Sequence, residues 1–179
     1  ISKAPTNWST KESAKAWSSE EVERVLEAIE SLPPELHKFP FDSVVRFTES
    51  KFKGNPASQA ARILAVYDSA FDQKTNLARV LAHEFAHTYY KSLPPRMGDD
   101  YRKKTGWVIE LVDREFFITR RKSGYVQPDG FNSHDEDFAN NLEFYLFEPS
   151  TLKRVTPEAF EWIDKSLSAK MKKGTEVKK

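Results

Sequence analysis

The sequence predicts one α+β domain in which a small sheet is combined with a larger number of helices. Three observations lead to this class. Several separate segments show helical periodicity with recognisable starts and stops. Two short segments are rich in β-branched and aromatic residues, as strands are. A chain of 179 residues that is 39% hydrophobic and 31% charged suits a single folded core.

We expect this domain to span residues 18–171. Residues 1–17 form a polar lead-in with little periodicity, and residues 172–179 form a basic, flexible tail. Because the sequence begins at Ile1 rather than at Met, we expect a further segment before it. No internal repeat or change in composition divides the chain, so we expect one domain and favour a monomer.

Residues 18–32 are expected to form the first helix. Ser18 with Glu21 three residues later fits a capping box, and the prolines at 33 and 34 stop the helix. Its predicted buried face follows the i, i+3, i+4, i+7 pattern and consists of Val22, Val25, Leu26 and Ile29.

Residues 41–49, "FDSVVRFTE", and residues 61–68, "ARILAVYD", are the two predicted strands. The segment "FKGNPAS" between them is expected to be a loop. We expect residues 61–70 to form the edge of the sheet or, as an alternative that stays open, an ordinary strand within it, because edge position cannot be read from the sequence. An edge strand can pair with an extended polypeptide, whereas an inner strand has both sides occupied.

The second half of the chain is predicted to be mainly helical. Residues 76–92 form a helix that ends before two prolines, and "PPRMGDDYRKKTG" after it is a polar connection. For residues 107–121 the periodicity does not distinguish helix from strand. Residues 135–148 form another helix, and a last helix is capped by Thr156 with Pro157 at its first position.

Composition removes several classes of function. The net charge of +1 gives no reason to expect nucleic acid as a partner, and no apolar run approaches the roughly 20 residues that span a bilayer. The chain has no cysteine, which excludes disulfides, thiolate metal ligands and a cysteine nucleophile. A chain without cysteine is compatible with an extracytoplasmic or secreted location, which we favour.

One motif carries chemistry. In "HEFAH", His83 and His87 lie four residues apart on a predicted helix, so both imidazoles point the same way. Glu84 lies beside them and can reach a water on the same metal ion. This H-E-x-x-H pattern is typical of zinc peptidases, and imidazole is a preferred ligand of zinc. We expect one Zn²⁺ per chain.

A catalytic zinc needs a third protein ligand. A histidine six residues after His87 is excluded, because Leu93 stands there. We expect Glu136, at the start of the helix over residues 135–148, to be the third ligand. Asn140, one turn further on, is expected to hydrogen-bond a ligand histidine.

Other residues compete for the third position. Glu110 has a spacing that some zinc peptidases use, and Glu143 shares a helix face with Glu136. His134 is a weaker candidate, and His37 is expected to be structural. Asp135 and Asp137 flank Glu136 and are expected to stabilise the start of the helix without affecting the metal.

The ordered motifs "HEFAH", "TGW", "SGY", "EDFAN" and "TPEAFEWI" resemble the catalytic domain of anthrax lethal factor and its bacterial relatives. The resemblance covers roughly residues 62–167. It implies a zincin-type fold: a small twisted sheet, an active-site helix that carries the H-E-x-x-H pattern, and a C-terminal helical part. It also implies that Glu136 is the third zinc ligand, whereas Asn140 stands where that family usually has Glu. Tyr125 looks like the family's transition-state donor.

The expected function is therefore that of a zinc metalloendopeptidase of the gluzincin class, acting on an extended polypeptide. Glu84 is the expected general base and Tyr125 the expected donor to the oxyanion. Two alternatives remain open: a catalytically silent binding or toxin-accessory module of the same fold, and a structural zinc site closed by His134. The class of substrate, whether host protein, the chain itself or a cell-wall peptide, also stays open.

Overall fold

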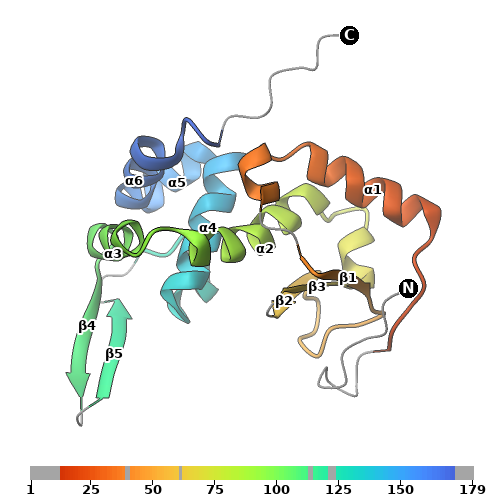
Figure 1. The fold of residues 1–179 in the computed structure, drawn as a ribbon, viewed down its shortest axis with the longest axis horizontal. Helices are drawn as coiled ribbons and strands as arrows, with labels where there is room; N and C mark the ends of the chain where they lie inside the picture. The colour runs from red at the N-terminus through yellow and green to blue at the C-terminus, as the bar shows by residue number, and fades with distance from the viewer. Residues whose placement is uncertain (1–12, 39–40, 61, 113–114, 121–123, 172–179) are drawn as a thin grey trace.

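The computed structural model describes residues 13–38, 41–60, 62–112, 115–120 and 124–171. The predicted α+β class is confirmed. The described residues form six α-helices, a three-stranded sheet and a separate two-stranded ribbon. In Figure 1 the sheet lies on one side of the molecule below α1, the remaining helices lie at the centre and on the other side, and the ribbon projects away from them.

The three-stranded sheet contains β1 (Ser43–Arg46), β2 (Ala57–Ala60) and β3 (Ile63–Val66) in the order β1-β3-β2. The central strand β3 runs parallel to β1 and antiparallel to β2. The prediction that residues 61–70 form the edge is therefore wrong. Leu64, Ala65 and Val66 are fully buried, as expected of a strand with neighbours on both sides. The outer strands are β1 and β2, and part of β2 was predicted to be a loop.

Helix α1 (Ser19–Glu30) begins with the predicted capping box. The Glu21 amide donates to Ser18 Oγ, and the Ser18 amide donates to Glu21 Oε2, both at 3.1 Å. The predicted buried face is only partly correct. Val25 is buried, but Val22 and Leu26 are 40% and 53% exposed. Val25 and Ala28 are the buried residues of α1, and Ile29 packs partly buried against the same core.

The last residues of the predicted polar lead-in form backbone contacts with the segment that ends β1. Ala14 forms an antiparallel bridge with Phe47, and the Lys15 amide donates to the Arg46 carbonyl at 2.8 Å. Residues 1–12 and the predicted tail at 172–179 lie outside the described residues.

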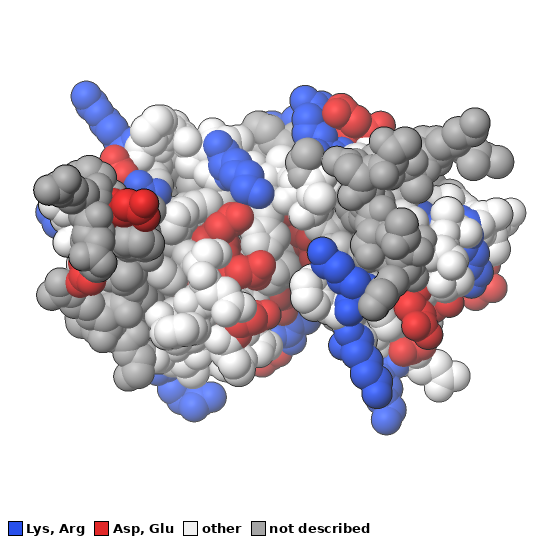
Figure 2. Space-filling view, turned by 90° about the horizontal axis from the view of Figure 1, so that it is seen from below, with Lys and Arg blue, Asp and Glu red and all other residues white. Residues whose placement is uncertain are grey.

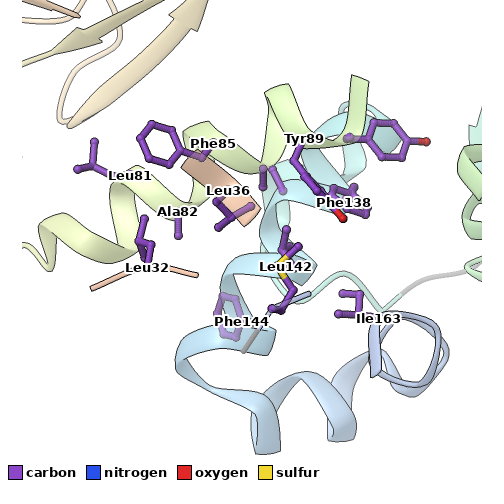
Figure 3. Close-up of a cluster of buried hydrophobic side chains, with 14 of the residues drawn as sticks. Leu32, Leu36, Leu81, Ala82, Phe85, Tyr89, Phe138, Leu142, Phe144 and Ile163 are labelled. Atoms are coloured by element: carbon purple, nitrogen blue, oxygen red, sulfur yellow. The ribbon is translucent and has the colours of Figure 1, made fainter. Parts of the chain in front are cut away.

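Two helices that were predicted, α2 (Leu77–Ser92) and α4 (His134–Phe147), pack against each other and form the centre of the core. Figure 3 shows Leu81, Phe85 and Tyr89 of α2 in the same apolar cluster as Phe138 and Leu142 of α4. The 3₁₀ helix η1 (Pro34–Lys38) adds Leu36 to this cluster. Arg79 near the start of α2 pairs with Glu143 near the end of α4, and His87 further along α2 lies beside Asp135 at the start of α4, so the two helices run antiparallel.

The segment after α2 differs from the prediction. The expected polar connection is a helix, α3 (Pro95–Lys104), because Pro95 suits a first turn and Tyr101 buries its side chain completely. The ambiguous residues form a hairpin of β4 (Trp107–Val112) and β5 (Glu115–Arg120).

The chain ends in α5 (Pro149–Val155), which was not predicted, and α6 (Pro157–Leu167), which was. Thr156 occupies the predicted N-cap position of α6, with Pro157 at the first helical position, but its side chain forms no capping hydrogen bond. Its hydroxyl donates to the Gly124 carbonyl at 2.9 Å, which fixes the loop before α4 against the last helices. Among the described helices, none has both the length and the hydropathy that a bilayer crossing requires.

Candidate metal centre

Helix α2 presents the two motif histidines side by side. Asn76 starts the helix by accepting a hydrogen bond from the Arg79 amide at 3.1 Å. His83 and His87 then lie one turn apart, and their Nε2 atoms are 3.2 Å from each other. As the sequence predicts, both rings point to one place.

Helix α4 brings the third group. Ser133 caps this helix by accepting from the Glu136 amide at 3.1 Å, which places Glu136 in its first turn. Glu136 Oε2 lies 3.4 Å from His83 Nε2 and 3.6 Å from His87 Nε2. Within the described residues, His83, His87 and Glu136 form the one cluster of side chains that could hold a metal ion.

The three donor atoms fit a small tetrahedral ion. Zinc bonds imidazole nitrogen and carboxylate oxygen at about 2.0–2.2 Å, which puts neighbouring donors of a tetrahedron about 3.3–3.6 Å apart. The observed separations are 3.2, 3.4 and 3.6 Å. Three protein donors also leave one corner of the tetrahedron open, and a catalytic metal needs that open corner.

The other ring nitrogens of the two histidines face carboxylates. His83 Nδ1 lies 3.2 Å from Glu143 Oε2, and His87 Nδ1 lies 3.1 Å from Asp135 Oδ1, the latter not aligned as a hydrogen bond. A carboxylate beside Nδ1 favours the tautomer with its proton there and turns the Nε2 lone pair toward the metal. Two such lone pairs and the Glu136 oxygen repel one another unless a proton or a cation lies between them.

Asn140 does not have the role that the sequence predicts for it. Its amide donates to Asp129 Oδ1 at 2.7 Å, while Glu143 and Asp135 occupy the positions beside the histidines. Asp135, which was expected to leave the metal unaffected, lies 3.1 Å from the Nδ1 atom of a candidate ligand, His87. Asp137 differs again: it is fully buried and accepts from Trp107 Nε1 at 2.9 Å, so it belongs to the core.

Arg79 continues the network away from the metal position. Its guanidinium donates to Glu143 and to Glu148, and it lies 4.4 Å from the centre of the Phe144 ring. These contacts hold Glu143 in place beside His83. Arg79, His83 and His87 are spaced by four residues along α2, so they share one helix face.

The charges around His83 favour its protonated form in the metal-free protein. Burial lowers the pKa of His83, but its contacts with Glu136 and Glu143 outweigh this effect and raise the pKa to about 10. The hydrogen bond with His83 in turn lowers the pKa of Glu136. Metal-free, the site therefore holds a proton in the place where the donor set fits a cation.

Glu84 is only 7% exposed and lines an open cleft together with His83 and His87. Burial raises the pKa of Glu84, although the nearby His83 and His87 oppose that change. A carboxylate with a raised pKa accepts a proton more readily near neutral pH, which is what a general base requires.

An open cleft of about 1330 Å³ lies over these groups. One wall is β2 with the loop before it, the floor is α2, and the opposite wall is α4 with the 3₁₀ helix η3 (Pro128–Phe131). Figure 2 shows acidic side chains gathered along the cleft, with basic side chains on both sides of them.

The remaining candidates do not join this cluster. Tyr125 packs its ring 6.3 Å from that of Trp107 and 6.0 Å from that of Phe131, and it is not among the described residues that line the cleft. Glu110 lies in β4, also outside that lining. His134 packs between Tyr90 and Trp107 rather than turning to the metal position.

His37 lies in η1, half-buried beside the apolar core with its ring centre 6.3 Å from that of Phe85, and it is not among the residues that line the cleft.

Comparison with protein-family models, with curated proteins and with solved structures found no match to this chain.

Proposed function

We propose that the protein is a zinc-dependent endopeptidase of the gluzincin class, with a zincin-type fold. One observation carries this proposal. Two imidazoles and a carboxylate meet at the separations of a tetrahedral site, and a buried glutamate lies next to them on the floor of an open cleft. The resemblance of the ordered motifs to the lethal factor catalytic domain supports the same assignment.

His83, His87 and Glu136 are the proposed zinc ligands. A bound zinc ion supplies a Lewis acid and lowers the pKa of water at its open position toward about 7. Glu143 and Asp135 orient the two histidines through their Nδ1 atoms. The side chains of α2 and α4 thus fix the site before a substrate arrives.

Glu84 acts as the general base in this proposal. Its carboxylate takes a proton from the attacking water and delivers it to the leaving amine. Burial raises the pKa of Glu84, which favours uptake of the proton from water. The protonated carboxyl then donates this proton to the leaving amine. Tyr125 stays a predicted oxyanion donor, and its ring lies against Trp107 and Phe131.

The edge strand β2 is the proposed support for an extended substrate. Within the described part of the chain, β2 pairs with β3 on one side, and its other side faces the cleft. An extended peptide can add to such an edge through main-chain hydrogen bonds. The peptide would then lie between β2 and the zinc ligands.

The test is hydrolysis of a mixed peptide library by the zinc-loaded protein, with Glu84→Gln as the matched variant. We expect cleavage by the unaltered protein, and a loss of at least 10²–10⁴-fold in the variant with zinc retained. Equal cleavage by both proteins would refute the role of Glu84. Zinc-dependent peptide binding without cleavage would instead favour the silent binding module.

A further inference from the structure

The cleft has two ends that differ in charge. At one end Lys91 bridges the walls, with its Nζ 3.4 Å from Gln59 Oε1 of β2 and 3.5 Å from Asp135 Oδ2 of α4. The other end lies at the start of α2. There the loop before β2 contributes Lys51 and Lys53, and the segment before α2 contributes Lys74.

Hydrogen bonds place these two basic segments next to each other. Ser69 Oγ donates to the Asn55 carbonyl at 3.0 Å, and Thr75 Oγ1 donates to the Ser69 carbonyl at 2.8 Å. Asn55 ends the loop that carries Lys51 and Lys53, and Thr75 follows Lys74 directly. The three lysines therefore belong to one end of the cleft, which we call the lysine end.

The carboxylates of the cleft are already engaged with other groups of the protein. Glu143 is held by Arg79 and His83, Asp135 by Lys91, and Asp129 by Asn140. Glu136 and Glu84 belong to the metal site. The acidic side chains of the cleft are thus balanced locally, and zinc would add two positive charges beside them.

Two of these lysines, Lys53 and Lys74, are not balanced in this way. Within the described residues, Lys53 and Lys74 are exposed and have no acidic partner. Glu49 and Asp72 are close to them in sequence, but neither lines the cleft. A substrate that passes this end therefore meets uncompensated positive charge.

The distance from the proposed metal site to the lysine end can be expressed as a number of residues of an extended substrate. Seven residues of helix separate Asn76, at the start of α2, from His83. At 1.5 Å per residue this is about 10 Å, or roughly three residues of an extended peptide at 3.3 Å each.

We infer that the cleft selects peptides with Asp or Glu about three residues from the scissile bond, on the side that lies over the lysine end. This inference rests on the proposed function and names the class of substrate for the same site. The acidic side chain pairs with Lys53 and Lys74, while the peptide backbone lies along β2.

The test begins with the zinc-loaded protein and a library of peptides derived from a whole proteome. Acidic residues should be enriched on one side of the cleaved bond only, near the third position. Two synthetic peptides are then made from the most frequent cleaved sequence, with Glu or Gln at that position. We expect a roughly fivefold higher kcat/KM for the Glu peptide, since exposed ion pairs are individually weak.

Charge reversal at Lys53 and Lys74 tests whether the preference for acidic peptides arises at the lysine end. In Lys53→Glu/Lys74→Glu the preference should disappear or reverse to the Gln peptide. The matched variant Lys103→Glu/Lys104→Glu changes the net charge equally, but on exposed positions of α3 outside the cleft, and should keep the preference. In the unaltered protein the preference should shrink as salt approaches about 1 M, where screening reaches about 3 Å.

Equal cleavage of the Glu and Gln peptides would overturn the inference and leave the proposed function standing. So would a preference that survives in the cleft variant. Absence of any zinc-dependent cleavage in the library would overturn the proposed function and this inference with it.

Discussion

At the scale of single residues, His83 shows how the site prepares for a metal. Its two ring nitrogens lie between Glu136 and Glu143, and the pKa of about 10 keeps the metal-free ring protonated at neutral pH. A ligand imidazole must be neutral at the nitrogen that binds the metal. Metal binding and proton release are therefore linked at this residue.

We expect zinc binding at pH 7 to release about one proton from His83. The sign follows from the raised pKa: the ring is charged when metal-free and must lose that charge when it binds. Calorimetric titration with zinc in two buffers of different ionisation enthalpy measures the number released. Release of no proton would show that His83 is neutral before the metal arrives.

The same pKa also sets a pH dependence of stability without metal. Because the folded pKa of His83 exceeds the unfolded value near 6.5, its contribution is complete below pH 6.5. That contribution is lost as pH rises from there through about 10.

Asp135 and Glu143 are expected to act on zinc through the histidines. Asp135→Asn and Glu143→Gln should each weaken zinc binding about 10- to 100-fold, because each removes a charge beside a ligand Nδ1. Asp129→Asn is the matched control, since Asp129 lines the same cleft but bonds Asn140. Competition with a zinc chelator gives the affinities. Three equal affinities would mean that these carboxylates do not orient the ligands.

The sequence predicts which candidate ligands lie together better than it predicts their partners, for a physical reason. His83, Glu84 and His87 are related by helix geometry, which spacing alone encodes. The proximity of Glu143 to His83 depends on how α2 and α4 pack, and no local pattern records that. The sequence does contain one signal for Arg79, because this residue continues the four-residue spacing of the two histidines along α2.

At the scale of elements, the failures of prediction have a common origin. Strand β2 has the sequence "ASQA", which lacks β-branched residues and forms a strand because β3 offers a partner. Helix α3 is mostly polar, and its one large buried side chain, Tyr101, gives no periodic pattern. In both segments tertiary contacts decide the structure, whereas α1, α2, α4 and α6 carry their own local signals.

Asp137 joins three elements and is expected to support stability rather than the metal. It lies on α4 and accepts from Trp107 at the base of β4 and, at 3.4 Å, from Tyr101 of α3. Asp137→Ala should lower the free energy of unfolding by about 3 kcal/mol, since it leaves buried donors without an acceptor.

Denaturant unfolding measures this change. The control is Asp99→Ala, which removes only an exposed pair with Arg102 and should cost less than about 1 kcal/mol. Similar losses in the two variants would contradict the structural role of Asp137.

At the scale of the whole molecule, the metal position links the two central helices. His83 and His87 come from α2 and Glu136 from α4, and the apolar core lies against the same pair. A bound ion therefore stabilises the folded state as a whole, by an amount that grows with its free concentration.

Removal of zinc with a chelator should accordingly lower the midpoint of thermal unfolding by about 10 °C. This value corresponds to about 4 kcal/mol at a thousandfold excess of zinc over Kd. Glu136→Ala should start from a lower midpoint and respond little to the chelator. An equal response in both proteins would place the stabilising metal elsewhere.

Zinc content after exhaustive dialysis is the measurement that tests the metal site most directly, if Glu136→Ala and Glu110→Ala are compared with the unaltered protein. Both glutamates are candidates from the sequence, but only Glu136 lies within 3.6 Å of both histidine Nε2 atoms. We predict close to one zinc per chain in the unaltered protein and in Glu110→Ala, and a large loss in Glu136→Ala. Loss of zinc with Glu110 and its retention without Glu136 would contradict the account.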